Sequence, residues 1–145
     1  MLNSSLIKDA ARTIGFDLCG VARCQKFTAE ADFLKQWIEA GNGLGLDYLS
    51  RNIDKRADVT QLVEGAKSVI VCGVSYKNAY SDGYPTSCRQ KIASYALTTD
   101  YHITIKRMLQ QLCAMLKEVC PTLTGRIFTD SAPVFEKRYA VEAGL

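Results

Sequence analysis

A short polar motif near the C-terminal end of the sequence contains a side chain suited to proton transfer. The motif is Thr-Asp-Ser-Ala-Pro at residues 129–133, and it follows a strand that we predict over residues 126–130. Ligands of open α/β sheets gather at such strand ends. In an apolar cavity the neutral form of Asp130 is favoured, and Asp130 can then act as a general acid. The alternative is that Asp130 only caps the helix that follows.

A second polar motif, Asp100-Tyr101-His102, contains the only histidine of the chain. An imidazole donates or accepts hydrogen bonds and changes protonation near pH 6.5. A single histidine excludes a metal site built from several histidines, and we predict no metal ligands here. The alternative is that His102 contributes only to the first turn of a helix. Both interpretations remain open at this point.

Two basic clusters allow anion binding. Arg56 ends the segment Asn-Ile-Asp-Lys-Arg at residues 52–56, and its guanidinium group can hold a phosphate or a carboxylate through two hydrogen bonds. The alternative for this segment is a solvent-exposed helix face. Lys137 and Arg138 allow the same two interpretations.

Spacing excludes two common cofactor motifs. The glycines at residues 41–45 follow a predicted helix rather than a strand, so they do not form a dinucleotide-binding loop. The cysteines contain no Cys-x-x-Cys pair and no run typical of an iron–sulfur cluster. We predict small buried thiols for most of them and an exposed thiol for Cys88, which lies in a polar loop. The six are Cys19, Cys24, Cys72, Cys88, Cys113 and Cys120.

Hydrophobic periodicity and capping residues predict helices that alternate with strands. This order indicates an α+β fold, an α/β sandwich with a mixed sheet flanked by helices, in a single or truncated domain over residues 1–145. We expect the strand at 68–76 to be central, the loop at 77–90 to be a lid or binding loop, and Phe33 and Ile103 to be buried. The predicted helices cover residues 3–14, 28–38, 99–119 and 134–144, and the strands 17–23, 68–76, 91–96 and 126–130.

Charge and hydropathy limit the partners. Eighteen Lys and Arg against fifteen Asp and Glu give a net charge of +3, which permits a nucleic-acid partner without requiring one. The longest apolar run, residues 69–74, is far shorter than the roughly 20 residues of a membrane span. The N-terminus lacks the pattern of a secretory signal. We therefore expect a cytoplasmic protein with no membrane partner, and nothing in the sequence defines an oligomeric state.

Four segments together resemble the N-terminal half of the epoxyqueuosine reductase family. The resemblance implies an oxidoreductase of queuosine biosynthesis that binds cobalamin and two [4Fe–4S] clusters. It also implies a tRNA substrate, whose epoxyqueuosine is reduced to queuosine, and a nitroreductase-like cobalamin-binding domain. In order, the segments are residues 45–56, 65–70, 94–102 and 129–138, the last running on to 143–145.

The resemblance also implies roles for individual residues. Asp130 falls on the family's proton donor and lies next to the cofactor, Arg56 and Ala93 fall on positions that contact cobalamin, and Tyr101 and His102 line the substrate cavity. Lys137 stands where relatives often have arginine, so no role is transferred to it.

This sequence lacks the ferredoxin-like part in which relatives of this family carry their cluster cysteines. We therefore expect the [4Fe–4S] clusters only in that part, and we expect the 145-residue chain to be inactive by itself. Three alternatives remain: a stand-alone cobalamin- or flavin-binding module, a fragment of a reductive-dehalogenase-like reductase, or a truncated α/β piece that binds nothing tightly.

Overall fold

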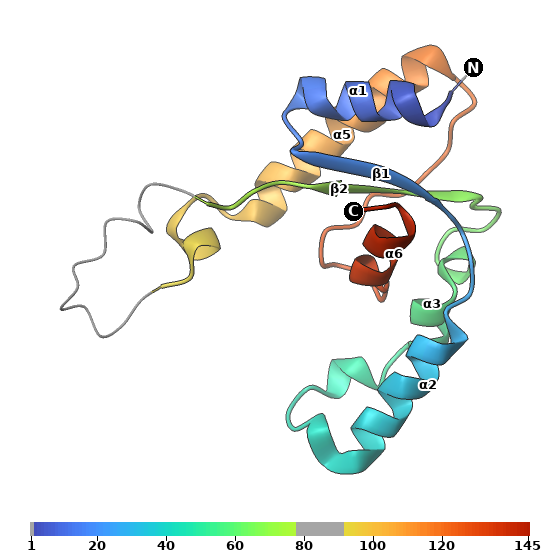
Figure 1. Cartoon of the computed structure of the whole chain (residues 1–145), viewed down its shortest axis with the longest axis vertical. Helices are drawn as coiled ribbons and strands as arrows, with labels where there is room; N and C mark the ends of the chain where they lie inside the picture. Colours follow the sequence, from blue (N-terminus) through green and yellow to red (C-terminus); the bar gives the residue numbers. More distant parts are fainter. Residues whose placement is uncertain (1, 78–91) are drawn as a thin grey trace. The chain divides into compact units, whose positions relative to one another are not determined.

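The computed structural model describes residues 2–77 and 92–145, and within them it shows helices with a small antiparallel sheet (Figure 1). The predicted α+β class is confirmed, but the predicted mixed sheet is wrong for the described residues, whose two strands pair antiparallel. The chain divides into two compact units, the first from Met1–Cys19 and Cys72–Asp130, the second from Gly20–Val71 and Ser131–Leu145. The main elements are α1 (Ser4–Ile14), β1 (Leu18–Arg23), α2 (Thr28–Trp37), α3 (Ile53–Ala57), β2 (Ser68–Gly73), α5 (Tyr101–Val119) and α6 (Glu136–Glu142).

Helix α1 begins and ends at the predicted residues. The side chain of Asn3 accepts a hydrogen bond from the backbone N–H of Leu6 at 2.9 Å, which satisfies one of the free donors of the first turn. Gly15 ends the helix with φ +107°, a left-handed conformation that glycine adopts without steric cost. Its N–H donates to the carbonyls of Ala11 and Arg12.

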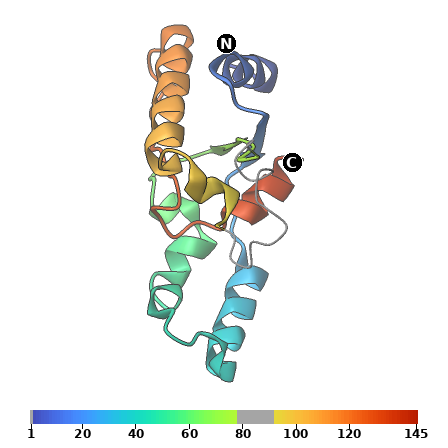
Figure 2. The same ribbon diagram turned by 90° about the vertical axis from the view of Figure 1, so that its left-hand side faces the viewer.

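Helix α1 packs against α5 within the first unit (Figure 2). Both helices have buried side chains, among them Ala11 on α1 and Leu112 and Leu116 on α5. Ile103 is 66% exposed, so its predicted burial is wrong. Ile103 lies in the first turn of α5, well before the buried Leu112 and Leu116 of the same helix.

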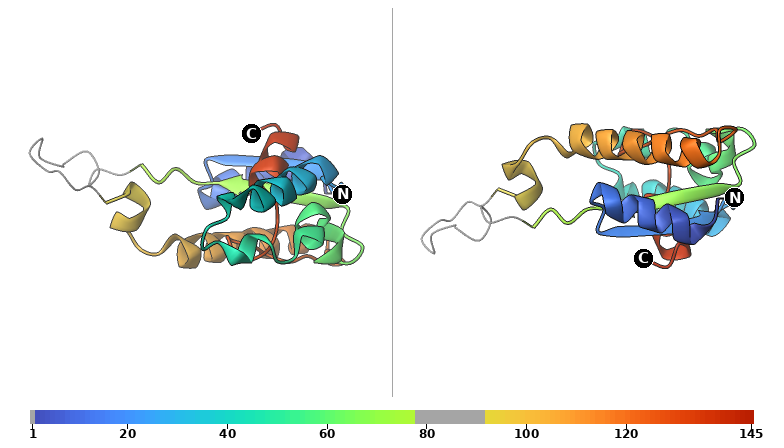
Figure 3. Two further views of the ribbon diagram at one scale, coloured as in Figure 1. Left: turned by 90° about the horizontal axis from the view of Figure 1, so that it is seen from below. Right: turned by 90° about the horizontal axis from the view of Figure 1, so that it is seen from above.

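Strands β1 and β2 form the sheet of the described residues, and they run antiparallel (Figure 3). Asp17 N–H donates to the carbonyl of Gly73 at 3.0 Å, and Cys24 N–H donates to that of Lys67 at 3.0 Å. The predicted central position of the 68–76 strand is wrong for the described residues, where β2 pairs only with β1 and none of its residues is fully buried. The apolar run indicates partial burial but does not specify neighbours.

Two predicted strands do not form. Residues 94–97 make a 3₁₀ turn (Ser94–Leu97), and residues 126–130 are irregular. Both segments are short, and neither pairs with another strand in the part of the chain that the structure describes. Most of the predicted loop at 77–90, with Cys88, lies outside the described residues.

The cysteines that the structure describes are half-buried rather than fully buried, and all are free thiols. Cys19 and Cys72 face each other from β1 and β2, with 3.8 Å between their Sγ atoms. Burial raises the pKa of Cys72 to about 12, and the neighbouring Cys19 adds to this effect. Both thiols are therefore protonated at neutral pH.

The second unit has its own core, built around Tyr139 of α6. Tyr139 is 1% exposed, and its ring meets that of Phe27 edge to face at 4.7 Å between centroids. The Tyr139 hydroxyl donates to the carbonyl of Gln25 at 3.1 Å. Ala22 and Val59 complete the buried cluster.

Helix α2 of the second unit does not bury Phe33, contrary to the prediction, although the neighbouring Leu34 and Trp37 are half-buried. Phe33 is 68% exposed, whereas the small residue Ala31 is 4% exposed. Thr28 is the first helical residue and makes no side-chain cap, because the cap position belongs to Phe27. Phe27, which precedes the helix, supplies the large apolar side chain of this part of the core.

Candidate active site

The N-terminal turn of α5 holds a polar cluster in the first unit. Asp100 caps the helix: its Oδ1 accepts the backbone N–H of His102 at 2.9 Å and lies 2.9 Å from the Nδ1 of the same residue. These hydrogen bonds, the backbone one above all, lower the pKa of Asp100. His102 thus contributes to the cap, as one interpretation predicted, and its half-exposed ring also remains accessible to a ligand.

Tyr101 connects this turn to Asp130. The Tyr101 hydroxyl donates to Oδ2 of Asp130 at 2.7 Å, across 29 positions of sequence. This hydrogen bond is the main cause that raises the pKa of Tyr101 to about 12; partial desolvation and the charge of Asp130 add to it. The structure therefore connects two of the predicted site residues by one hydrogen bond.

Asp130 does not stand at the end of a strand, contrary to the prediction. Its backbone adopts a left-handed conformation with φ +49°, which aspartate tolerates better than most residues. Its side chain is exposed, so the described residues do not provide the apolar cavity considered for a general acid. What positions the carboxylate is the phenol of Tyr101.

An aromatic row extends away from this contact within the first unit. The ring of His102 stacks on that of Tyr101 at 4.1 Å, Tyr95 meets Tyr101 edge to face at 6.1 Å, and Tyr76 meets Tyr95 at 6.3 Å. Sequence reasoning missed Tyr76 and Tyr95. The count of seven tyrosines indicates only that aromatic contacts are available in the chain. No local sequence pattern predicts that residue 76 contacts residue 95.

Arg56 lies in the last turn of α3, in the second unit. Its guanidinium group is 6.0 Å from the centroid of the Phe135 ring. Its Nε is buried and has no hydrogen-bond partner among the described residues. A buried donor without an acceptor is costly, so this atom is a candidate contact for an acceptor group of a ligand.

Ala93 is exposed and has an extended backbone just before the 3₁₀ turn that carries Tyr95. It belongs to the first unit, with Tyr101, His102 and Asp130, whereas Arg56 belongs to the second. The structure brings Tyr101, His102 and Asp130 together.

The cluster at Lys137 and Arg138 is explained in part by the fold. Arg138 forms ion pairs with Glu30 and Glu142, and its guanidinium group lies 5.2 Å from the centroid of the Phe27 ring. Arg138 is thus part of the packing between α2 and α6 in the second unit. The exposed Lys137 shows no comparable contact.

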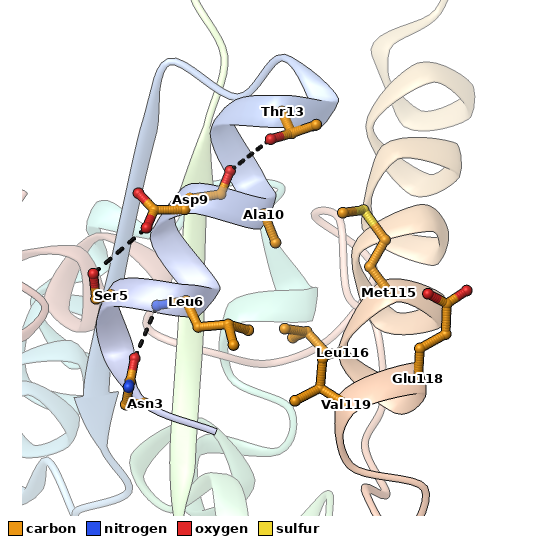
Figure 4. A pocket seen from close by; sticks show the side chains of 10 residues that line it. All are labelled: Asn3, Ser5, Leu6, Asp9, Ala10, Thr13, Met115, Leu116, Glu118 and Val119. Carbon is orange, nitrogen blue, oxygen red and sulfur yellow. Dashed lines mark hydrogen bonds between the residues drawn. The ribbon is translucent and has the colours of Figure 1, made fainter. Parts of the chain in front are cut away.

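A shallow groove of about 550 Å³ lies between α1 and α5 (Figure 4). Apolar side chains such as Leu6 and Leu116 line it, with Asp9 and Glu118 among its polar residues. Its α5 residues begin at Met115, fourteen positions after Tyr101, which is about 20 Å along a helix. The groove is therefore separate from the polar cluster at the start of α5.

Two kinds of feature are absent from residues 2–77 and 92–145. No group of three or more His, Cys, Asp or Glu side chains is placed to hold a metal ion there. No helix in this part of the chain has the length and apolar character needed to cross a membrane.

A family model described as "Epoxyqueuosine reductase QueG, DUF1730" matches residues 56–131. The match covers just over half of the chain and includes Arg56, Tyr101, His102 and Asp130. The chain belongs to this family.

Individual relatives agree with the family match. The chain is 39% identical over 145 residues to the epoxyqueuosine reductase of Cyclobacterium marinum and 37% identical over 142 residues to that of Leadbetterella byssophila. These alignments cover 99% and 98% of the chain and 46% of each relative, so the chain spans about half the length of these relatives. The structure of epoxyqueuosine reductase from Streptococcus thermophilus has the same fold, with a TM-score of 0.85 at 21% identity over 99% of this chain and 39% of that one.

Proposed function

We propose that this chain is the N-terminal, cobalamin-binding part of an epoxyqueuosine reductase, a cytoplasmic oxidoreductase that reduces epoxyqueuosine to queuosine in tRNA. The observation that carries the proposal is the hydrogen bond between Tyr101 and Asp130 inside the segment matched by the family model. The iron–sulfur clusters of such an enzyme belong, in this proposal, to a part of the protein outside these 145 residues.

Asp130 is the proposed proton donor. Opening and removing an epoxide oxygen leaves negative charge on that oxygen, and a positioned acid must neutralise it. The exposed carboxyl group of Asp130 is accessible to a substrate, and the hydrogen bond from Tyr101 fixes its orientation.

Tyr101 and His102 are the proposed cavity residues. The phenol of Tyr101 holds the carboxyl group of Asp130 in one orientation at 2.7 Å. Because its pKa is raised to about 12, Tyr101 keeps its own proton at neutral pH and remains a hydrogen-bond donor. The ring of His102, stacked on Tyr101, adds a further polar edge beside the phenol.

Two residues, each considered within its own unit, have features suited to contact with a cobalamin. The buried Nε of Arg56, which lacks a partner among the described residues, suits a carbonyl or phosphate oxygen at the periphery of the cofactor. The methyl group of Ala93 is exposed on an extended segment and is small enough to lie against a flat macrocycle. When bound, the cobalamin would supply the two electrons of the reduction. The epoxide oxygen would leave as water, taking one proton from Asp130 and one from solvent.

Cofactor binding is tested by titrating the 145-residue chain with cob(II)alamin and following the absorbance spectrum. Arg56→Ala is expected to weaken saturable binding, whereas Arg51→Ala, an exposed arginine of the same unit, serves as the matched control. The same titration is made on a chimera in which the chain replaces the matching part of the Cyclobacterium marinum relative. Absence of binding in both proteins refutes the cobalamin proposal.

Turnover is tested in the same chimera with an anticodon stem–loop RNA that contains epoxyqueuosine. Asp130→Asn is expected to abolish conversion to queuosine while cobalamin stays bound, and Asp47→Asn, an exposed aspartate of the second unit, is the control. Turnover at the wild-type rate in Asp130→Asn removes Asp130 from the role of acid.

A further inference from the structure

Two tyrosines that the proposed reduction does not use extend the aromatic row outward from the site. Tyr76 is 67% exposed and Tyr95 is 51% exposed. Large aromatic side chains contribute most to stability when they are buried. Rings that remain this exposed have most of their surface available for contact with another molecule.

The geometry connects these rings to the candidate site. Tyr95 meets Tyr101 at an interplanar angle of 86°, and Tyr76 meets Tyr95 at 88°. Each ring thus restricts the orientation of the next without covering it in a parallel stack. A ligand that occupies the site beside Tyr101 would place its neighbouring groups within reach of Tyr95 and then of Tyr76.

Two basic side chains lie close in sequence to the row, in addition to the carboxylates of Asp100 and Asp130 that contact His102 and Tyr101. Lys77 follows Tyr76 directly and is exposed, and Lys106 lies one helical turn after His102 on the same face of α5, also exposed. Ammonium groups at these positions can contact phosphates without specifying a base. Aromatic rings combined with nearby basic side chains are the usual surface for single-stranded nucleic acid.

We propose that Tyr76 and Tyr95 form a stacking surface for unpaired nucleobases of RNA next to the modified nucleoside, with one base on each ring, since the two ring planes are nearly perpendicular. This inference rests on the proposed function, because it takes the substrate to be a nucleoside within an RNA loop. The ring faces of the two tyrosines supply the stacking contacts, and Lys77 and Lys106 contact the backbone phosphates. Stacking tolerates any base, so the surface contributes affinity and position rather than sequence specificity.

The inference is tested by fluorescence anisotropy of a labelled anticodon stem–loop RNA titrated with the 145-residue chain. Base–aromatic stacking corresponds to a loss of about 5- to 150-fold in affinity on truncation to alanine, so Tyr76→Ala and Tyr95→Ala are each expected to raise Kd within that range. Tyr76→Phe and Tyr95→Phe keep the ring face and are expected to stay within about twofold of the wild type. The matched control is Tyr48→Ala, a 56% exposed tyrosine of the second unit, which is expected to leave Kd unchanged.

A second probe separates stacking from charge. A fully paired RNA duplex of the same length offers phosphates but no unpaired base, so the alanine variants should bind it as the wild type does. Thermal melting of each variant checks that its fold is retained. The inference is overturned if the wild type does not bind the stem–loop, if both alanine variants bind it as tightly as the wild type, or if Tyr48→Ala loses as much affinity.

Failure of this inference is distinguishable from failure of the proposed function. The proposed function is judged by cobalamin binding and by epoxide reduction, neither of which measures RNA affinity. Retained turnover with unaffected RNA binding in Tyr76→Ala and Tyr95→Ala refutes only the stacking surface. Loss of cobalamin binding with tyrosine-dependent RNA binding refutes only the reductase proposal.

Discussion

Replacing Asp130 by alanine removes the acceptor of the Tyr101 hydroxyl and the negative charge beside it. In the intact chain the hydrogen bond at 2.7 Å raises the pKa of Tyr101 from its ordinary value near 10 to about 12. The difference corresponds to a roughly hundredfold stronger hold on the phenolic proton. Since Asp130 supplies the largest cause, the Asp130→Ala variant should return most of the way to the ordinary value.

The pH dependence has a definite sign. A folded-state pKa above the unfolded value means that the folded chain binds this proton more tightly than the unfolded chain does. The contact therefore stabilises the fold fully below pH 10, and this contribution is lost as the pH rises towards 12. Asp130→Ala should remove that alkaline dependence. Near pH 7 to 8 the fold of the variant should lack the stabilisation that the contact provides.

The assay is an NMR titration of chain labelled with ¹³C at the tyrosine ζ carbon, from pH 8 to 11.5. The Tyr101 signal is assigned by its absence in Tyr101→Phe, and Asp100→Asn is the control because Asp100 is a minor cause of the shift. We expect the wild-type signal to change little by pH 11 and the Asp130→Ala signal to titrate near pH 10. Equal midpoints in the two proteins would refute the assigned contact.

Three further predictions concern stability and reactivity. In urea titrations, Gly20→Ala should lower the free energy of unfolding by roughly 1–3 kcal/mol, because a Cβ there would lie 2.6 Å from the Ala143 carbonyl oxygen. The control Gly125→Ala, which has open space around it, should leave the free energy of unfolding unchanged. Tyr139→Phe should cost about 1 kcal/mol in the same assay through its lost hydrogen bond, and an unchanged midpoint would contradict that contact. The pKa of Cys72 is about 12, against an ordinary 9.0. Cys72 should therefore react with iodoacetamide at pH 8 about a thousandfold more slowly in the folded than in the unfolded chain, because the thiolate is the reactive form. The rates are measured by mass spectrometry of the alkylated peptide, and equal rates would contradict the burial of Cys72.

Features set by neighbouring residues were predictable from the sequence. Asn3 and Gly15 mark the limits of α1, and Asp100 marks the start of α5, because capping depends on side chains within one turn of the helix end. The role of Asp100 as a cap also placed Tyr101 and His102 correctly in the first turn of that helix.

Features set by distant residues were not predictable. Nothing near Tyr101 indicates that its hydroxyl binds Asp130, 29 positions later, and nothing near Tyr76 indicates its contact with Tyr95. The exposure of Phe33 has the same cause, since the face that a helix buries depends on what packs against it. The residues assigned to cobalamin and to substrate came from the family resemblance and stay predictions.

The contact between Asp100 and His102 determines which nitrogen of the imidazole carries hydrogen. A carboxylate oxygen only accepts hydrogen bonds, so the Nδ1 that lies 2.9 Å from Oδ1 of Asp100 must be the donor. In the neutral ring the lone pair then belongs to Nε2. A group that hydrogen-bonds to this edge of the neutral ring must bring its own N–H or O–H, so the helix cap selects donors over acceptors among the groups that His102 can recognise.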